Sequence, residues 1–174
     1  KNPRRLANRH LAFFSLILAA WAIVVGLIMA VQDWRRAELL VRLSFAVGAF
    51  LPAQFNLLSI GITRTSFQRR EVRLGGLLYI LSVYTALLPL HPAFIRSMSL
   101  LPSHTGLPGP EVTYDPVLFC IYVAAVVIPM LAGLVSLVPR WRRATGMRRA
   151  ELQYLFLGVL AGSLWTLATS LIPP

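Results

Sequence analysis

The sequence has 174 residues, of which 57% are hydrophobic and only 13% are charged, a balance too apolar for an ordinary soluble domain. Its 17 basic and 6 acidic residues give a net charge of +11, but the basic residues gather at the ends of long apolar runs and form no continuous face. This distribution is typical of membrane orientation and argues against nucleic-acid binding, so the lipid bilayer is the expected partner and nucleic acid is not.

Five apolar runs are long enough to cross the roughly 30 Å hydrocarbon core of a bilayer as helices. We therefore predict an all-α fold, a polytopic transmembrane helix bundle of about five spanning helices, with residues 1–174 forming a single transmembrane domain. The expected spans cover residues 11–31, 39–63, 74–90, 117–138 and 152–172, and an outer loop covers residues 91–116.

Prolines mark the irregular points of these runs. Pro52 lies inside the second run and predicts a kink there, because proline removes a hydrogen bond from the helix. Pro89 and Pro92 end the third and shortest run. The first run resembles a signal peptide only superficially, since it is too long and has no small-residue cleavage site.

The outer loop is rich in proline, glycine and serine and cannot be helical throughout. Its first part, residues 94–101, is apolar enough to lie on the membrane surface. The same segment is also able to form half of a hairpin with residues 111–114. The sequence leaves both alternatives open.

The basic residues divide unequally between the two sides of the predicted spans. Thirteen lie on the side of the N-terminus: Lys1, Arg4, Arg5, Arg9, Arg64, Arg69, Arg70, Arg73, Arg140, Arg142, Arg143, Arg148 and Arg149. Arg35, Arg36, Arg42 and Arg96 lie on the other side. Because basic residues near span ends are retained in the cytoplasm, we predict a cytoplasmic N-terminus and, after five crossings, a C-terminal end outside.

No arrangement of residues in the sequence predicts catalysis. The three histidines, His10, His91 and His104, lie at helix ends or in the outer loop, and Cys120 is the single cysteine. Neither the histidine pair of a membrane zinc protease nor the buried Ser and His of a membrane serine protease is present. We therefore expect no enzyme, no metal site and no cofactor in this chain.

The second span contains the most polar residues at membrane depth, Gln54 and Asn56. Amides are costly in hydrocarbon, so both should face protein. They predict either a ligand pocket between helices or an interhelical hydrogen bond of about 1 kcal/mol. Arg42, Ala49 and Asn56 share one face at heptad spacing, which suggests a polar cleft open to the outside.

Gly158 and Gly162 form a pair of small residues four positions apart in the fifth span. Such a pair lets another helix approach closely. The contact predicted is helix packing within this chain, with a dimer contact as the alternative.

The chain resembles the N-terminal seven-helix membrane region of bacterial sensor histidine kinases. The resemblance rests on residues Tyr114-Asp115-Pro116-Val117-Leu118-Phe119, on the segment from Arg140-Trp141-Arg142-Arg143 to Glu151-Leu152-Gln153-Tyr154-Leu155, on Asn8-Arg9 and Ala20-Trp21-Ala22, and on Arg42-Leu43-Ser44-Phe45 with Phe50-Leu51-Pro52-Ala53. It implies that the five predicted spans are helices two to six of seven. It also implies that dimerisation, phosphoacceptor and ATP-binding domains follow the seventh helix in the family.

The chain departs from this family in two ways. The phosphoacceptor histidine motif and the ATP-binding boxes are absent from the sequence, so kinase activity cannot be assigned to these residues. Gln54 and Asn56 also stand where the family is usually apolar.

Two functions remain open. The first is a membrane-embedded sensing and anchoring module of a histidine kinase-like protein of two-component signalling, multi-pass in the bacterial cytoplasmic (inner) membrane. The alternative is a structural accessory subunit packed in a larger bacterial membrane complex. In either case the expected partners are other membrane helices, in a homodimer or a larger assembly.

Overall fold

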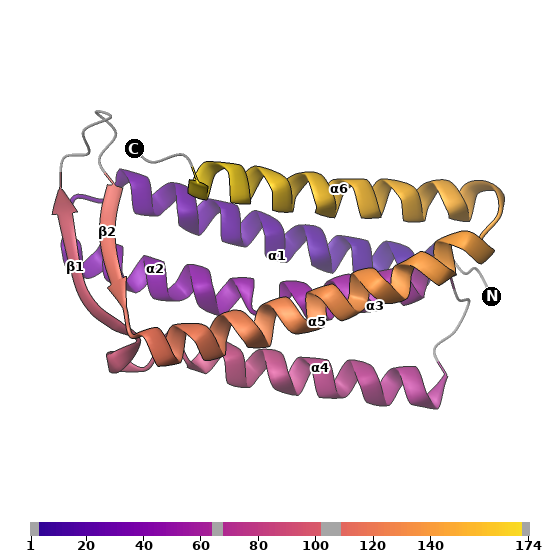
Figure 1. Ribbon diagram of the computed structural model, residues 1–174, viewed down its shortest axis with the longest axis horizontal. Helices are drawn as coiled ribbons and strands as arrows, with labels where there is room; N and C mark the ends of the chain where they lie inside the picture. Colours follow the sequence, from indigo (N-terminus) through magenta and orange to yellow (C-terminus); the bar gives the residue numbers. More distant parts are fainter. Residues whose placement is uncertain (1–3, 64–67, 102–108, 172–174) are drawn as a thin grey trace.

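A bundle of long helices makes up most of the protein, with a short hairpin across one end (Figure 1). The structure is a computed structural model that describes residues 4–63, 68–101 and 109–171. Its elements are α1 (Arg4–Ala30), α2 (Trp34–Gly48), α3 (Leu51–Thr63), α4 (Arg69–Leu87), the short 3-10 helix η1 (Pro92–Phe94), β1 (Ile95–Leu101), β2 (Gly109–Tyr114), α5 (Pro116–Arg143) and α6 (Gly146–Leu171). The predicted helical bundle is confirmed, with a small two-stranded sheet in addition.

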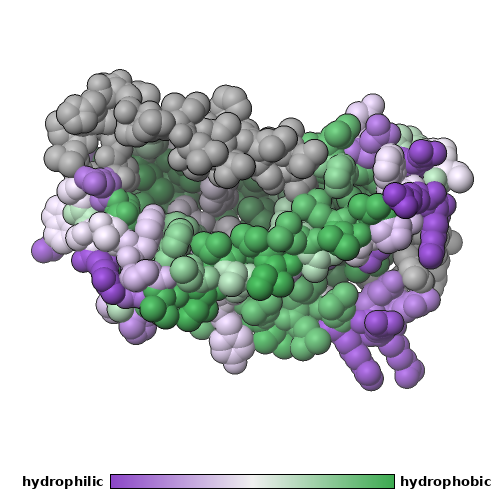
Figure 2. Space-filling model, in the orientation of Figure 1, coloured by the Kyte–Doolittle hydropathy of each residue, from purple (hydrophilic) through white to green (hydrophobic). Residues whose placement is uncertain are grey.

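Three helical stretches within the described ranges are long and apolar enough to cross a membrane: Leu6–Ala30, Trp34–Ile62 and Pro116–Arg143. Their outward side chains are apolar and exposed, for example Leu16 at 64% and Val135 at 71%. On the face that Figure 2 shows, an apolar band lies between two more hydrophilic ends. Such a surface is what lipid contact requires and what water disfavours.

The second span is broken where Pro52 predicts a kink. Helix α2 ends at Gly48, and α3 begins at Leu51, immediately before the proline. Pro52 has no N–H to donate to the carbonyl of Gly48, and its ring crowds that carbonyl. The amide of Phe50 donates to Val47 O at 3.2 Å in a tight turn. The kink is therefore confirmed as a short break that separates two helices.

Helix α3 lies at the centre of the bundle, packed against α1, α4, α5 and α6. Small residues let its neighbours approach closely. A Cβ added at Gly61 would lie 3.5 Å from the Cα of Ala7 on α1. A Cβ added at Gly133 of α5 would lie only 2.9 Å from the side-chain amide of Asn56. Close approach through glycine is the usual way in which membrane helices pack.

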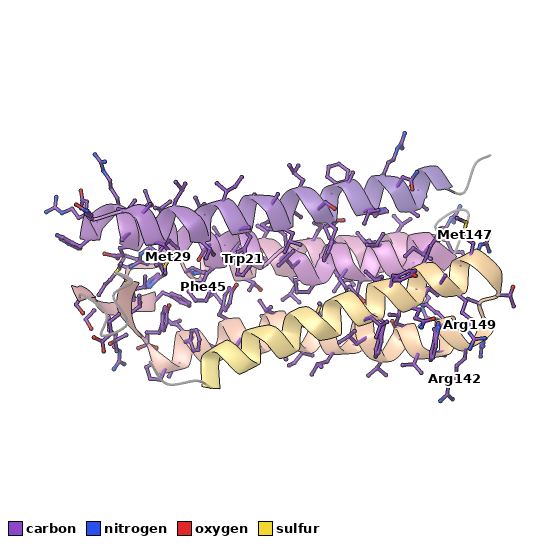
Figure 3. All side chains as sticks on the ribbon, turned by 90° about the horizontal axis from the view of Figure 1, so that it is seen from above. Trp21, Met29, Phe45, Arg142, Met147 and Arg149 are labelled. Atoms are coloured by element: carbon purple, nitrogen blue, oxygen red, sulfur yellow. The ribbon has the colours of Figure 1, made fainter. Side chains whose placement is uncertain are left out.

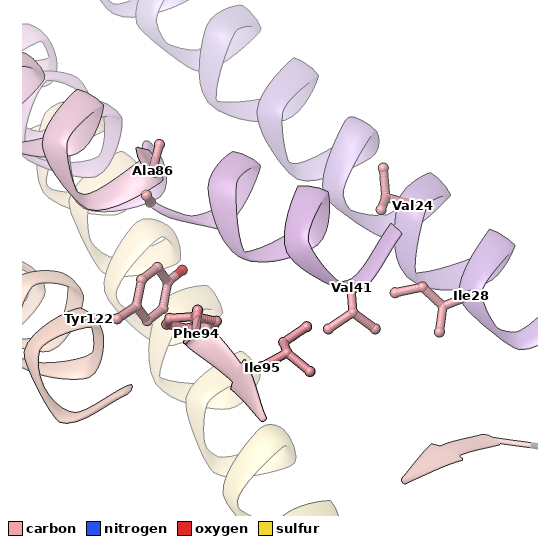
Figure 4. Close-up of a cluster of buried hydrophobic side chains, with 8 residues drawn as sticks. Val24, Ile28, Val41, Ala86, Phe94, Ile95 and Tyr122 are labelled. Carbon is pink, nitrogen blue, oxygen red and sulfur yellow. The ribbon is translucent and has the colours of Figure 1, made fainter. Parts of the chain in front are cut away.

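The buried apolar side chains form two clusters. At the hairpin end, a cluster packs around Phe94 of η1 and Ile95 of β1 (Figure 4). It includes Val24 and Ile28 of α1, Val41 of α2, Ala86 of α4 and Tyr122 of α5. At the opposite end, Phe55, Leu137 and Leu152 join α3, α5 and α6. The first cluster therefore fixes the hairpin to four helices at once.

The hairpin settles the alternative that the sequence left open for residues 94–101. Strand β1 pairs antiparallel with β2, with Ser97 opposite Thr113 and Ser99 opposite Glu111. The register shifts between Ile95 and Ser97, and such an irregularity turns one strand relative to the other. The hairpin prediction for residues 111–114 is thus confirmed.

That residues 1–174 form a single transmembrane domain stays a prediction.

Replacing Gly133 by alanine should destabilise the bundle by about 1–3 kcal/mol, because the new methyl group would overlap Asn56 and Phe55. Gly76 on α4 is the matched control, since a Cβ there would meet no described atom within 4 Å. Gly76→Ala should leave stability unchanged or raise it by up to about 1 kcal/mol through helix propensity. Thermal unfolding in detergent measures both variants, and equal effects would contradict the close packing of α3 on α5.

Candidate functional site: an arginine clamp at the base of the hairpin

Arg42 holds α2 to the chain segment that leads from α4 into the hairpin. Its Nη1 donates to Pro89 O at 2.7 Å and to His91 O at 2.6 Å, and its Nη2 donates to Pro92 O at 3.2 Å. Its Nε and Nη2 donate to Oε1 of Glu38 at 3.0 and 2.7 Å. These five hydrogen bonds match the five N–H donors of a guanidinium group. We call this arrangement the Arg42 clamp.

The positive charge of Arg42 is stabilised both by Glu38 and by the carbonyl groups that follow α4. The side chain of Arg42 is only 12% exposed and that of Glu38 27%, so the ion pair is partly shielded from water. The carbonyls that Arg42 binds follow the C-terminal end of α4, where a helix has its negative pole and its unpaired carbonyl groups. The clamp therefore supplies positive charge and hydrogen-bond donors where the chain needs both.

Five aromatic rings lie directly beside the clamp and come from α2, η1, β2 and α5. Phe45 packs edge-on against the rings of Phe94, Tyr114, Phe119 and Tyr122, with centroids 5.1–6.2 Å apart. Tyr114 stacks on Phe119 at 4.8 Å. The hydroxyl of Tyr122 donates to Phe45 O at 2.7 Å, close to the break between α2 and α3. Edge-to-face pairs add specific geometry to apolar burial, so this aromatic cluster fixes how the hairpin sits on α2.

Asp115 joins the hairpin to the start of α5. Its carboxylate accepts from the amides of Val117 and Leu118, each at 3.0 Å, and therefore caps the helix. Arg96 of β1 donates to the same carboxylate from Nη2 at 2.7 Å. The bond from the Leu118 amide, followed by that from Arg96, holds the pKa of Asp115 below its usual range.

Gln54 and Asn56 bind separate neighbours on opposite sides of α3. The Gln54 amide nitrogen donates to the hydroxyl of Tyr79 on α4, and its oxygen lies 3.4 Å from Nδ1 of His10 on α1. Asn56 Nδ2 donates to Pro129 O of α5 at 3.1 Å and to Pro52 O at 2.9 Å. Both side chains thus make contacts between helices.

The predicted cleft of Arg42, Gln54 and Asn56 stays a prediction. The three residues bind different partners, and Arg42 lies at the hairpin end, while Gln54 and Asn56 lie beyond the break on α3. The hollow of about 680 Å³ between α1, α3 and α6 is lined by other residues.

Of the two glycines of the predicted packing pair on α6, the structure describes the surroundings of Gly158 alone. A Cβ added at Gly158 would meet nothing within 4 Å. The surroundings of Gly162 lie outside the described residues. Packing of these glycines within the chain or in a dimer therefore stays a prediction.

Sequence reasoning missed most contacts at this end of the bundle, although two short-range signals were available, one for the Arg42 clamp and one for Asp115. Glu38 precedes Arg42 by four residues on one helix, the order that favours an ion pair. Asp115 followed by Pro116 is a helix-start pattern, with an acidic cap before proline at the first helical position. Neither signal reveals that Phe45 or Phe94 lies beside these residues, since such contacts join distant parts of the chain.

The described residues bring together no group of three or more His, Cys, Asp or Glu side chains able to hold a metal ion. The Arg42 clamp, the aromatic cluster and Asp115 form a junction of hydrogen bonds and aromatic rings at the base of the hairpin. The hydrogen bonds of Arg42 and the rings packed around Phe45 hold the hairpin on α2.

Arg42→Gln should destabilise the protein by about 2–4 kcal/mol, because it leaves Glu38 and three carbonyls without their partner. Arg36→Gln on the same helix is the matched control, since the Arg36 side chain is 80% exposed and lies 3.7 Å from Asp33. Thermal unfolding of both variants tests this, and a loss in Arg42→Gln no larger than in Arg36→Gln would refute the clamp.

Asp115→Asn should lower the unfolding temperature at pH 7 and have a smaller effect at pH 3. Asparagine still caps the helix, so this variant removes only the charge that binds Arg96. Because the pKa is lowered in the folded state, the stabilisation is present above the unfolded value of about 4 and is lost as the pH falls through the folded value. If the unfolding temperatures of the unchanged protein and Asp115→Asn differ by the same amount at pH 7 and at pH 3, the charge effect is ruled out.

A comparison with protein families places the chain by its whole length. The family described as N-terminal 7TM region of histidine kinase matches residues 1–174. No curated protein and no solved structure matches the chain. The resemblance noted in the sequence is therefore confirmed, and the chain belongs to the family of N-terminal seven-helix membrane regions of histidine kinases.

Proposed function

We propose that this chain is a sensing and anchoring module with no catalytic role of its own, embedded in the bacterial cytoplasmic membrane as a multi-pass protein. Family membership supports a membrane sensing region. The observation that carries the proposal is the Arg42 clamp, which ties the hairpin to the broken second span. A change at the hairpin thereby has a direct path into the helix bundle.

The path from hairpin to bundle has three steps. The clamp and the aromatic cluster hold the hairpin on α2. The break at Ala49 and Phe50 lets α2 change its angle relative to α3, because the Phe50 amide bonds only three residues back, to Val47 O, and Pro52 has no N–H to donate. Helix α3 contacts α1, α4, α5 and α6, so its movement reaches all of them. In this proposal the bundle has two helix packings that differ in the angle between α2 and α3. A signal shifts the equilibrium between them only if it binds the two packings with different affinity.

The orientation proposed puts the hairpin outside and the arginine-rich end in the cytoplasm. Figure 3 shows Arg142, Met147 and Arg149 together at one end, with Met29 and Phe45 toward the other. The excess of basic residues at the first end supports this orientation, because such residues are retained on the cytoplasmic side.

Cysteine labelling tests the orientation. In a Cys120→Ser chain, Ser99→Cys on β1 should react with a membrane-impermeant maleimide on intact spheroplasts. Thr145→Cys, between α5 and α6, should react only after lysis. Labelling of position 145 before lysis, with position 99 protected, would reverse the proposed orientation.

Purification from native membranes tests the sensing role against that of an accessory subunit. The proposal predicts an intact mass well above the 19.3 kDa of this sequence and a kinase region that is autophosphorylated with ATP. Arg42→Gln should change that autophosphorylation by about fivefold, since a change of about 1 kcal/mol in the free-energy difference between the two helix packings has that size. A mass near 19.3 kDa with stoichiometric partner proteins would overturn the proposal and favour the subunit.

A further inference from the structure

Two hollows meet at the arginine-rich end of the bundle, and Arg148 lines both of them. The larger has a volume of about 680 Å³ and lies between α1, α3 and α6. The smaller, about 300 Å³, lies where α3 and α4 approach the turn between α5 and α6. An apolar space among the helices and a charged pocket at their end are thus neighbours at Arg148.

The larger hollow is apolar over most of its walls. Leu11 of α1 and Leu155 of α6 line opposite sides, and Leu58 and Ile62 of α3 lie between them. Leu11 is 51% exposed, so the hollow opens toward the surface. Asn8, Arg148 and Glu151 line it as well. In a bilayer such an opening would admit a lipid chain, because lipid tails fill the apolar spaces between helices.

The smaller hollow carries an excess of positive charge. Arg140, Arg143 and Arg148 line it, against the single carboxylate of Glu71. Arg140 donates from Nη1 to Ser59 Oγ at 2.8 Å, and Glu71 accepts from the Gln68 amide at 2.8 Å. Arg143 and Arg148 are exposed and form no ion pair with another residue in the described ranges. These two guanidinium groups are the ones placed to bind an anion.

The start of α6 adds to this positive field. Its first turn has no acidic residue and contains Arg148 and Arg149. The N-terminus of a helix has its positive pole, so arginine there is unfavourable until an anion approaches. Arg149 lies over the ring of Trp141 at 5.5 Å, and tryptophan is typical of the level of lipid headgroups. The charged pocket therefore lies where phosphates of a bilayer are found.

We propose that these two hollows form a binding site for one anionic phospholipid. Its phosphate binds Arg143 and Arg148, since guanidinium groups match phosphate oxygens in charge and geometry. One acyl chain enters the hollow between α1, α3 and α6 and separates α1 from α6. An apolar helix in the same place would cover Arg148 without supplying an anion, which is unfavourable. The site is distinct from the Arg42 clamp and does not depend on the proposed sensing role.

The headgroup half of the site is tested by counting retained lipids with native mass spectrometry. The full chain is released from nanodiscs of phosphatidylcholine with one-tenth phosphatidylglycerol. One phosphatidylglycerol should stay bound, and Arg143→Gln with Arg148→Gln should reduce its retention by about tenfold. Arg35→Gln with Arg36→Gln removes the same charge at the other end and should have no effect. Equal retention of the two lipids, or equal loss in the two double variants, would overturn the proposal.

The acyl-chain half is tested by filling the larger hollow. Leu11→Trp should displace the phosphatidylglycerol, whereas Leu16→Trp should not, because Leu16 is 64% exposed on the same helix and lines neither hollow. Glycerol phosphate at matched concentration should give no rise in unfolding temperature, while phosphatidylglycerol should give one. An equal rise with glycerol phosphate would reveal an anion site without a lipid chain. A lipid-free dimer would show that a second helix occupies the hollow, and either result refutes the lipid site.

Discussion

A largely buried guanidinium must find a partner for each of its five N–H donors, and this requirement shapes the hairpin end of the molecule. Arg42 meets it with one carboxylate on its own helix and three carbonyls from a segment 47–50 residues further along the chain. Satisfying the arginine therefore fixes where α4 ends and where the hairpin begins. Phe94 follows directly after that segment and packs against Phe45 in the aromatic cluster.

The remainder of the bundle depends on the helix that follows the proline break. Helix α3 is surrounded by the others, so its polar side chains find partners in protein and avoid lipid. Asn56 reaches a carbonyl of α5 because Gly133 leaves room for it. At the far end the same helix contributes Leu58 and Ile62 to the hollow proposed to hold a lipid chain. The break at Pro52 and the central helix α3 thus connect the hairpin end of the bundle to its arginine-rich end.

Much of this fold could be predicted from the sequence because its signals are local. Apolar run lengths locate the helices, and Pro52 locates the break. The position of the hairpin on α2 could not be predicted, because Phe94 and Tyr122 meet Phe45 across many residues of chain. Heptad spacing placed Arg42 and Asn56 on one face, but the break lies between them, and their recorded partners differ. Gly158 fits a packing motif, yet a motif cannot say which helix, if any, it contacts.

The central claim is that Arg42 makes the hairpin and α2 a single rigid unit. Spin-label distances in nanodiscs test it most directly, with labels at Leu39 of α2 and Glu111 of β2 in a Cys120→Ser chain, both of them exposed positions. The account predicts one narrow distance distribution when Arg42 is present and a broad one in Arg42→Gln. A distribution that is equally narrow in both proteins would show that the hairpin is held by other contacts, and would contradict the clamp as the link between hairpin and bundle.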